Sequence, residues 1–240
     1  MIKGILRLLF PPKCVFCKDL TENENFAVCQ SCLRDIWYNQ RACTICGTPL
    51  DTVYGDTICT YCRRHKRNFT KAYVPFVYKD QVRSAILQFK FGGRRASAVT
   101  FAAFILMKMR ELEAQRPDMI TYVPMHFLRL GKRGYNQAAL LASALGKMLN
   151  VPVCATLRKK KNTIPQSKKK GRDRRYSLQD AFALRKNTEL RGKRILLLDD
   201  VITTGTTLHR CAGVLRKAGA LEVQVAAVAA PPFSHKGANE

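Results

Sequence analysis

The chain has 240 residues, 47% of them hydrophobic, which is enough for one ordinary domain with a real core and a second, small one. Lys and Arg outnumber Asp and Glu 42 to 17, and the resulting formal charge of +25 indicates a polyanionic partner, with nucleic acid the first candidate. The apolar opening from Ile5 to Phe10 is too short for a transmembrane segment and lacks a secretory cleavage site, so we expect a cytoplasmic protein.

Eight of the ten cysteines fall in four C-x-x-C pairs whose first members lie 15, 14 and 16 residues apart. Two thiolates at this spacing grip one tetrahedral Zn²⁺, and a second pair about a dozen residues on completes a four-cysteine shell. Disulfides are the alternative, but a reducing compartment keeps thiols free. We therefore predict two structural zinc ions in a module spanning residues 1–70, with the ligands Cys14, Cys17, Cys29, Cys32, Cys43, Cys46, Cys59 and Cys62.

Pairing in sequence order gives two successive zinc ribbons, and a cross-braced arrangement is the alternative. The sequential arrangement closes shorter loops and so costs less chain entropy. Four thiolates per metal leave no open position, so the zinc ions are expected to fold the module rather than to catalyse a reaction. The residues expected to fill the small module are Phe16, Phe26, Ile36, Trp37 and Tyr38.

From residue 71 onward, strand and helix patterns alternate, which is typical of an α/β domain with a parallel sheet. The basic stretch 63–71 is predicted to be a linker, and residues 71–240 form the main domain. The expected elements are a strand at 73–78, a helix around 82–89, a helix at 96–113, a strand at 119–123, a helix at 138–149, and a last strand at 223–228.

The strand at 119–123 runs into a loop, residues 124–137, that carries Arg129, Lys132 and Arg133. Open α/β sheets bind ligands at the carboxyl ends of their strands, so this loop is a candidate anion site. A solvated helix start capped by Asn136 is the alternative reading of its end.

The most basic run of the chain spans residues 158–175 and holds ten Lys or Arg in eighteen positions. It has no apolar periodicity, so we predict a flexible loop. Its cations are expected to meet an anionic ligand, DNA, or each in turn, and the candidates are Lys168, Lys169, Lys170, Arg172, Arg174 and Arg175.

The stretch 194–219 reads as strand, loop and helix. Four consecutive aliphatic residues from Ile195 to Leu198 indicate a strand buried on both faces, and apolar residues then recur at helical spacing. Between the two elements stand two carboxylates, Asp199 and Asp200, followed by hydroxyls around Gly205. Carboxylates suit sugar hydroxyls or Mg²⁺, and the amides of a helix N-terminus suit a phosphate, so together they describe a ribose-5-phosphate site.

This stretch resembles the loop of type I phosphoribosyltransferases that binds phosphoribosyl pyrophosphate (PRPP), and it matches at every place from Ile195 to Thr207. The alternative is an ordinary strand-to-helix connection with capping residues. The resemblance implies PRPP with Mg²⁺ as the ligand and the binding residues Asp199, Asp200, Thr203, Thr204, Gly205, Thr206 and Thr207. Purine-salvage members carry an acid where this chain has Thr203, which disfavours purine salvage.

The loop after the strand at 119–123 indicates a more specific family. Val-Pro followed by Arg-Gly-aromatic-Asn-Gln is similar to the ComF competence-protein family, whose members also carry N-terminal cysteine knuckles. This likeness, which runs from Cys14 to about Val228, implies a pyrophosphate loop with Pro124, Arg133, Asn136 and Gln137. It also implies that the basic run lies where a phosphoribosyltransferase lid would close, although Ser177 stands where an Asn is expected.

Two classes of function follow. One is an enzyme that transfers ribose-5-phosphate from PRPP to a nitrogenous acceptor, a reaction that needs positioning and charge stabilisation rather than a nucleophile. The other is a DNA-handling protein of competence and DNA uptake that binds PRPP, contacts single-stranded DNA and meets other competence proteins. We combine them as a PRPP-binding protein of natural transformation, and a base- or nucleotide-salvage enzyme with an incidental basic surface remains the alternative.

Overall fold

The computed structural model describes residues 11–21, 26–50, 57–160 and 181–232. Its first elements are α2 (Gln30–Asp35), α3 (Thr60–Arg64), β1 (Ala72–Tyr73), β2 (Phe76–Val77), α4 (Asp80–Phe91), α5 (Ser97–Glu111) and β3 (Met119–Tyr122). Next come α6 (Phe127–Arg133), α7 (Gln137–Leu149), β4 (Leu157–Lys159) and β5 (Phe182–Leu184). The last are β6 (Arg194–Leu198), α9 (Thr206–Lys217), β7 (Glu222–Ala226) and β8 (Ala229–Ala230).

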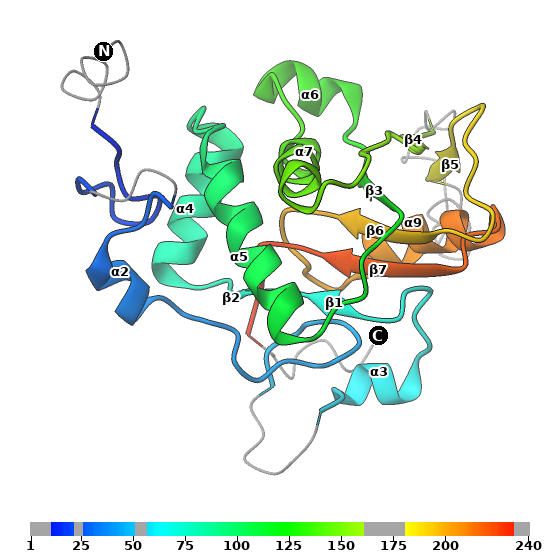
Figure 1. Ribbon diagram of the computed structural model, residues 1–240, viewed down its shortest axis with the longest axis horizontal. Helices are drawn as coiled ribbons and strands as arrows, with labels where there is room; N and C mark the ends of the chain where they lie inside the picture. The colour runs from blue at the N-terminus through cyan, green and yellow to red at the C-terminus, as the bar shows by residue number, and fades with distance from the viewer. Residues whose placement is uncertain (1–10, 22–25, 51–56, 161–180, 233–240) are drawn as a thin grey trace, which may run out of the picture.

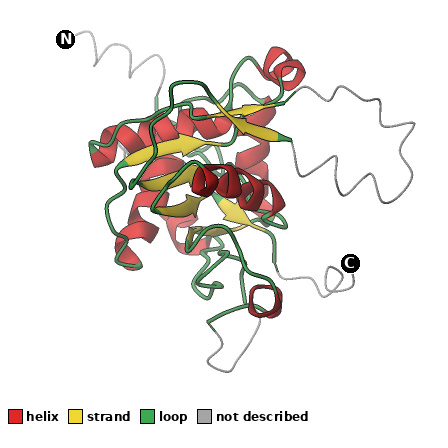
Figure 2. Ribbon diagram, turned by 90° about the vertical axis from the view of Figure 1, so that its right-hand side faces the viewer, coloured by secondary structure: helices red, strands yellow, loops and turns green. Residues whose placement is uncertain are grey.

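The central sheet has four parallel strands in the order β1-β7-β6-β3 (Figure 1). β2 pairs with β8 in parallel, and β4 pairs with β5 antiparallel. Helices cover the strands on both sides (Figure 2). The predicted α/β fold with a parallel sheet, preceded by cysteine-rich modules, is confirmed.

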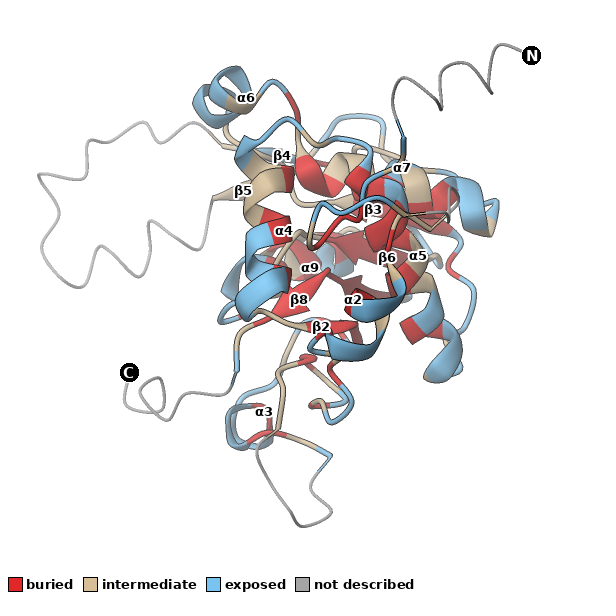
Figure 3. Ribbon diagram, turned by 90° about the vertical axis from the view of Figure 1, so that its left-hand side faces the viewer, coloured by how far each residue is buried: buried red, intermediate tan, exposed pale blue. Residues whose placement is uncertain are grey.

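The two faces of β6 belong to two different cores. Leu196 and Leu198 pack with residues of α4, α5 and α7, whereas Ile195 and Leu197 pack with the apolar face of α9. Successive side chains of a strand point to opposite faces, so a run of aliphatics without alternation fits a strand covered on both sides. Figure 3 accordingly shows burial concentrated in the strands and on the sheet-facing sides of the helices.

Most predicted elements of the main domain are present, with differences that have local causes. The strand expected at 73–78 is divided into β1 and β2, because Pro75 between them has no N–H to donate. The loop expected at 124–137 contains the helix α6, capped by the ring of His126 and ended by Gly134 in the left-handed conformation, φ 72°. The β4–β5 hairpin was not predicted from the sequence. No helix of the described ranges is long and apolar enough to cross a bilayer.

The first cysteine module shares its core with the main domain. The ring of Phe16 lies 5.7 Å from that of Phe76 and 6.3 Å from that of Phe104, and Phe26 lies 4.5 Å from Phe104, all between centroids. Ile36 and Tyr38 join the same cluster. These residues therefore fill the small module, as expected, and also pack against the core of the main domain.

Trp37, also expected inside the module, is 46% exposed. The ammonium of Lys79 lies over its ring, 4.1 Å from the ring centroid. The aromatic residues of this module therefore divide between an interior shared with α4 and α5 and an outer surface.

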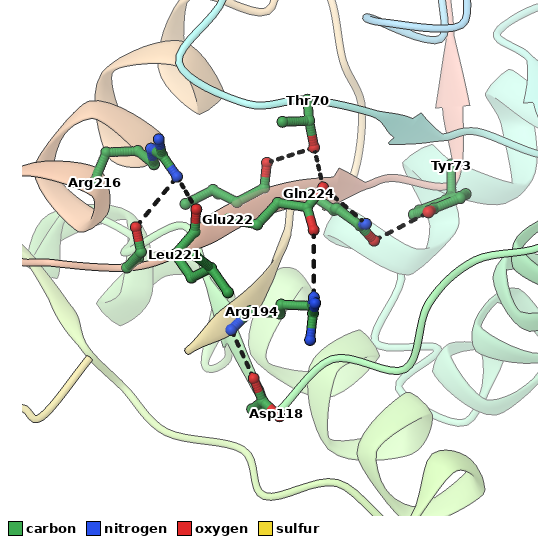
Figure 4. A network of polar contacts seen from close by, with 10 residues as sticks. Thr70, Tyr73, Asp118, Arg194, Arg216, Leu221, Glu222 and Gln224 are labelled. Atoms are coloured by element: carbon green, nitrogen blue, oxygen red, sulfur yellow. Dashed lines mark hydrogen bonds and ion pairs between the residues drawn. The ribbon is translucent and has the colours of Figure 1, made fainter. Parts of the chain in front are cut away.

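A polar network fixes the amino-terminal end of the sheet (Figure 4). The carboxylate of Glu222 accepts a hydrogen bond from the hydroxyl of Thr70 at 2.6 Å and from the amide of Gln224 at 3.2 Å, and it pairs with Arg194 at 3.8 Å. The amide oxygen of Gln224 accepts from the hydroxyl of Tyr73 at 3.0 Å. These contacts hold the residues just before β1 against β7. They therefore fix the position at which the predicted linker, residues 63–71, joins the sheet.

Candidate functional site

The connection from β6 to α9 places the predicted ribose-phosphate residues at the carboxyl end of the sheet. Gly205 is the N-cap of α9 with φ 71°, a left-handed conformation that favours glycine, and beside it the Oγ1 of Thr204 accepts from the N–H of Thr206 at 3.4 Å. Thr203, Thr204, Thr206 and Thr207 are exposed around it. The exposed hydroxyls and the start of α9 together form an arrangement that suits an anion.

The two carboxylates stand next to this helix start and are held by different donors. Lys90 at the end of α4 pairs with Asp200 at 2.9 Å, and both side chains are mostly buried. Asp199 accepts a hydrogen bond from the backbone N–H of Asp200 at 2.8 Å. Burial, and then the neighbouring charge of Asp200, raise the pKa of Asp199 to about 7. Within the described residues, the second oxygen of each carboxylate has no partner, so both retain free acceptors.

Oxygen atoms of this kind fit a hard cation. Mg²⁺ is bound in proteins by one or two carboxylates together with phosphate oxygens and water. Asp199 and Asp200 supply the carboxylates, and the helix start beside them supplies a place for phosphate. The residues present therefore fit the implied Mg²⁺ with its phosphorylated ligand.

The second predicted loop leaves the sheet beside the first. Tyr122 of β3 is the register partner of Leu198 of β6, and the N–H of Val123 donates to the Leu198 carbonyl at 2.9 Å. Pro124 and Asp199 therefore begin their loops from neighbouring strands. Asn136 closes the second loop, because its amide donates to the Val123 carbonyl at 3.1 Å and its Oδ1 caps α7.

Two other residues of this loop, Arg133 and Gln137, contact the carboxyl end of α4. Gln137 is fully buried, its amide donates to the Lys90 carbonyl at 3.3 Å, and its Oε1 accepts from Arg133 at 3.3 Å. The guanidinium of Arg133 lies 4.6 Å from the ring centroid of Phe91. Arg133 and Asn136 remain partly exposed, whereas Gln137 lies in the interior and holds the carboxyl end of α4, where Lys90 meets Asp200.

Arg67 is a site residue that the sequence analysis missed. It lies in the stretch expected to be a linker, yet its Nη2 donates to the carbonyl of Thr204 at 3.0 Å, 137 positions along the chain. A Cβ added at Gly205 would lie 3.5 Å from its guanidinium carbon. The adjacent Asn68 holds His209 of α9, to which its backbone N–H donates at 3.1 Å. No sequence pattern marked these contacts, because they depend on how the second cysteine module folds back.

The eight paired thiols form two clusters in sequence order. Cys14, Cys17, Cys29 and Cys32 make one, Cys43, Cys46, Cys59 and Cys62 the other, and in each the ligand atoms lie within 4.8 Å of one another. Cys17 and Cys29 are 3.5 Å apart and Cys46 and Cys59 3.7 Å apart, close to the roughly 3.8 Å edge of a tetrahedron with Zn–S bonds of about 2.3 Å. Both clusters fit structural zinc, and the geometry corresponds to sequential ribbons.

Purified protein is expected to hold two zinc ions per chain, because each cluster offers a complete four-thiolate shell. Elemental analysis by inductively coupled plasma mass spectrometry, normalised to protein concentration, measures the ratio. A ratio of one or lower in protein prepared without chelator would contradict two closed sites.

The structure also places the two unpaired cysteines and part of the basic run. Cys211 is buried and Cys154 is partly buried. Of the basic run, only Arg158, Lys159 and Lys160 are described, at and just after β4. The DNA or lid candidates Lys168, Lys169, Lys170, Arg172, Arg174 and Arg175 lie outside the described residues.

Comparison with known families gives two matches along the chain. Residues 5–65 match the model of a double zinc ribbon domain. Residues 99–237 match the model of a phosphoribosyl transferase domain.

Similar proteins extend over nearly the whole chain. Competence protein F of Haemophilus influenzae is 31% identical over 219 residues, covering 89% of this chain and 94% of that protein. DNA utilization protein YhgH of Salmonella typhimurium is 28% identical, covering 91% of this chain and 96% of its own length. Competence protein ComFC of Bacillus subtilis is 27% identical over 201 residues, covering 80% of this chain and 79% of that protein.

Proposed function

The chain belongs to the ComF family, whose proteins join a double zinc ribbon to a phosphoribosyltransferase domain, and on that premise we propose that it binds PRPP with Mg²⁺ and acts in DNA uptake, in contact with single-stranded DNA. The observation that carries PRPP binding is the start of α9, where two carboxylates with free oxygens stand beside a helix N-terminus surrounded by exposed threonine hydroxyls. Relatives named for competence and DNA utilization support the DNA role.

In this proposal each group of the site has one task. Asp199 and Asp200 accept hydrogen bonds from the ribose hydroxyls or hold the Mg²⁺, which would supply charge neutralisation between the phosphates. The N–H groups and hydroxyls from Thr203 to Thr207 bind the 5-phosphate. Arg133, with the loop at Val123 and Pro124, faces the pyrophosphate.

Calorimetric titration with Mg-PRPP, repeated with single-stranded DNA present, tests both halves of the proposal. We expect binding of Mg-PRPP and a weaker apparent affinity when DNA is present, because both ligands are polyanions drawn to the same basic chain. Absence of heat with Mg-PRPP alone, at protein concentrations that still bind DNA, would remove the PRPP half.

The affinity for Mg-PRPP is expected to depend on the ionisation of Asp199. The pKa of this carboxyl is raised to about 7, and the ligand needs it charged, so binding is expected to be about tenfold weaker at pH 6 than at pH 8. The Lys90 ammonium lowers that pKa, so Lys90→Met should move the midpoint upward. If the pH dependence came from ionisation of the ligand instead, Lys90→Met would have the same midpoint as the parent. That result would contradict the assignment to Asp199.

Single-stranded DNA is expected to bind without strong sequence preference. The basic run 158–175 can neutralise several phosphates, and each adds roughly 0.7 to the slope of log affinity against log salt. Replacing Lys168, Lys169 and Lys170 by Gln should flatten that slope by about two units. Fluorescence anisotropy with labelled homopolymers measures it, and an unchanged slope would place the DNA site elsewhere on the protein.

A further inference from the structure

A basic groove lies between the second zinc ribbon and α9. The ribbon side contributes residues 64–68 and Tyr61, the other wall is α9, and the volume of this open groove is about 950 Å³. The α9 residues that line it recur at helical spacing on one face of the helix, namely Thr206, His209, Arg210, Gly213, Val214 and Lys217. The opposite face, with Leu208 and Leu215, is buried. We call this space the ribbon groove.

The ribbon groove is strongly positive. Five of its lining residues are cations, Arg64, Lys66, Arg67, Arg210 and Lys217, and the described residues that line it include no Asp or Glu. Cations gathered in a concave surface focus the local field, so the groove attracts a polyanion. Phe182 lines its rim, and Phe182 is the strand partner of Lys159 in the β4–β5 hairpin. The groove therefore lies close to residues 158–160, the described part of the basic run.

Stacked planar groups project from the ribbon side of the groove. The ring of His65 stacks on that of Tyr61, 4.4 Å between centroids and 25° between planes. The guanidinium of Arg67 lies 4.3 Å from the centroid of the same Tyr61 ring. The Tyr61 ring therefore contacts both His65 and Arg67. The outer face of His65 meets no other ring among the described residues and can extend the stack by one planar group.

We propose that the ribbon groove binds a segment of single-stranded nucleic acid, with phosphates on its cations and one base stacked on His65. Positive grooves with exposed rings bind single strands in this way, since every base offers a flat face. A duplex is disfavoured, because its bases are already stacked on one another. The inference rests on the proposed function, to which it adds a location on the protein that differs from the basic run.

Charge-neutral variants test the electrostatic half. Lys66 and Lys217 are exposed, and neither makes an ion pair within the described part of the chain. For Lys66→Gln with Lys217→Gln we expect a salt slope flatter by about 1.4 and an affinity for labelled oligo-dT about 25-fold weaker at 0.1 M salt. The matched control is Lys13→Gln with Lys147→Gln, two exposed lysines outside the groove, which should leave the slope within about half a unit of the parent.

His65→Ala tests the stack. It is expected to weaken oligo-dA binding at least about fivefold while leaving the salt slope unchanged, because it removes a ring and no phosphate contact. If the parent binds DNA, the lysine pair binds like its control and His65→Ala binds like the parent, the groove assignment is overturned and the proposed function stands. Tighter binding of duplex than of single strand by the parent would also overturn it. A parent that binds no DNA removes the DNA half of the proposed function itself.

Discussion

Replacing Asp199 and Asp200 together by Asn is expected to weaken Mg-PRPP binding by a factor of about 100 or more. Two charge-assisted interactions are lost, each worth about 1.5–3 kcal/mol, and neither amide can hold Mg²⁺ as a carboxylate does. Isothermal titration at pH 8, where Asp199 is ionised in the parent, gives the largest difference in affinity between the parent and the variant.

The fold of the double variant is expected to survive. A carboxyl whose pKa rises on folding costs stability once the pH exceeds its ordinary value, and this cost is complete above about pH 7 for Asp199. Asn removes that cost, which offsets the lost pairing of Asp200 with Lys90. The unfolding temperature at pH 8 should therefore stay within a few degrees of the parent.

The matched control is Asp118→Asn. Asp118 immediately precedes β3 and lies beside the amino end of β6, where its Oδ2 accepts from the backbone N–H of Arg194 at 2.7 Å, and Asn keeps an oxygen acceptor there. This variant should bind Mg-PRPP like the parent. Undiminished binding by the Asp199 and Asp200 variant would show that the ribose site lies elsewhere.

The strand, loop and helix from β6 to α9 could be predicted from the sequence because all of their parts are contiguous. The aliphatic run that becomes β6, the two acids and the glycine lie within a dozen positions, and each has one local structural role. The two cysteine clusters were equally readable, since the C-x-x-C spacing brings the thiols together without reference to the rest of the chain.

Arg67 and Gln137 could not be assigned in the same way. Arg67 reaches Thr204 only because the second ribbon folds back over α9, a contact between residues 137 positions apart. Gln137 belongs to a polar motif, yet it is buried because the end of α4 offers the Lys90 carbonyl as a partner. Polar character in a sequence does not distinguish a ligand contact from a buried structural hydrogen bond.

The aromatic residues of the first ribbon show the same limit in the core. Phe16 and Phe26 have no helical or strand periodicity that would reveal which surface they cover. Their partners are Phe76 and Phe104, more than fifty positions away. This packing changes the expected consequence of losing a zinc ligand.

Cys29→Ser is expected to release one zinc and to destabilise the whole chain. Zinc binding supplies about 10–16 kcal/mol to small ribbons, comparable with the roughly 5–15 kcal/mol stability of a whole domain. When the first ribbon unfolds, Phe16 and Phe26 leave Phe76 and Phe104 exposed, so the main unfolding transition should fall by about ten degrees or more.

Native mass spectrometry counts the remaining zinc, and circular dichroism follows the main transition. Cys154→Ser is the control, because Cys154 belongs to neither cluster and should change neither quantity. One zinc lost with the main transition unchanged would mean that the ribbon unfolds independently and that the shared aromatic cluster contributes little.

Cys59→Ser tests whether the second ribbon contributes to Mg-PRPP binding. Cys59 is the N-cap of α3, which carries Tyr61, and the Tyr61 ring supports Arg67 over the Thr204 loop. Loss of the second zinc should therefore weaken Mg-PRPP binding in protein that still has its main fold, whereas Arg67→Ala should weaken it with both zinc ions retained. Titration of the two variants at a temperature below both transitions makes the comparison. Equal PRPP affinity in the parent, Cys59→Ser and Arg67→Ala would show that the second ribbon does not act on the ribose-phosphate loop.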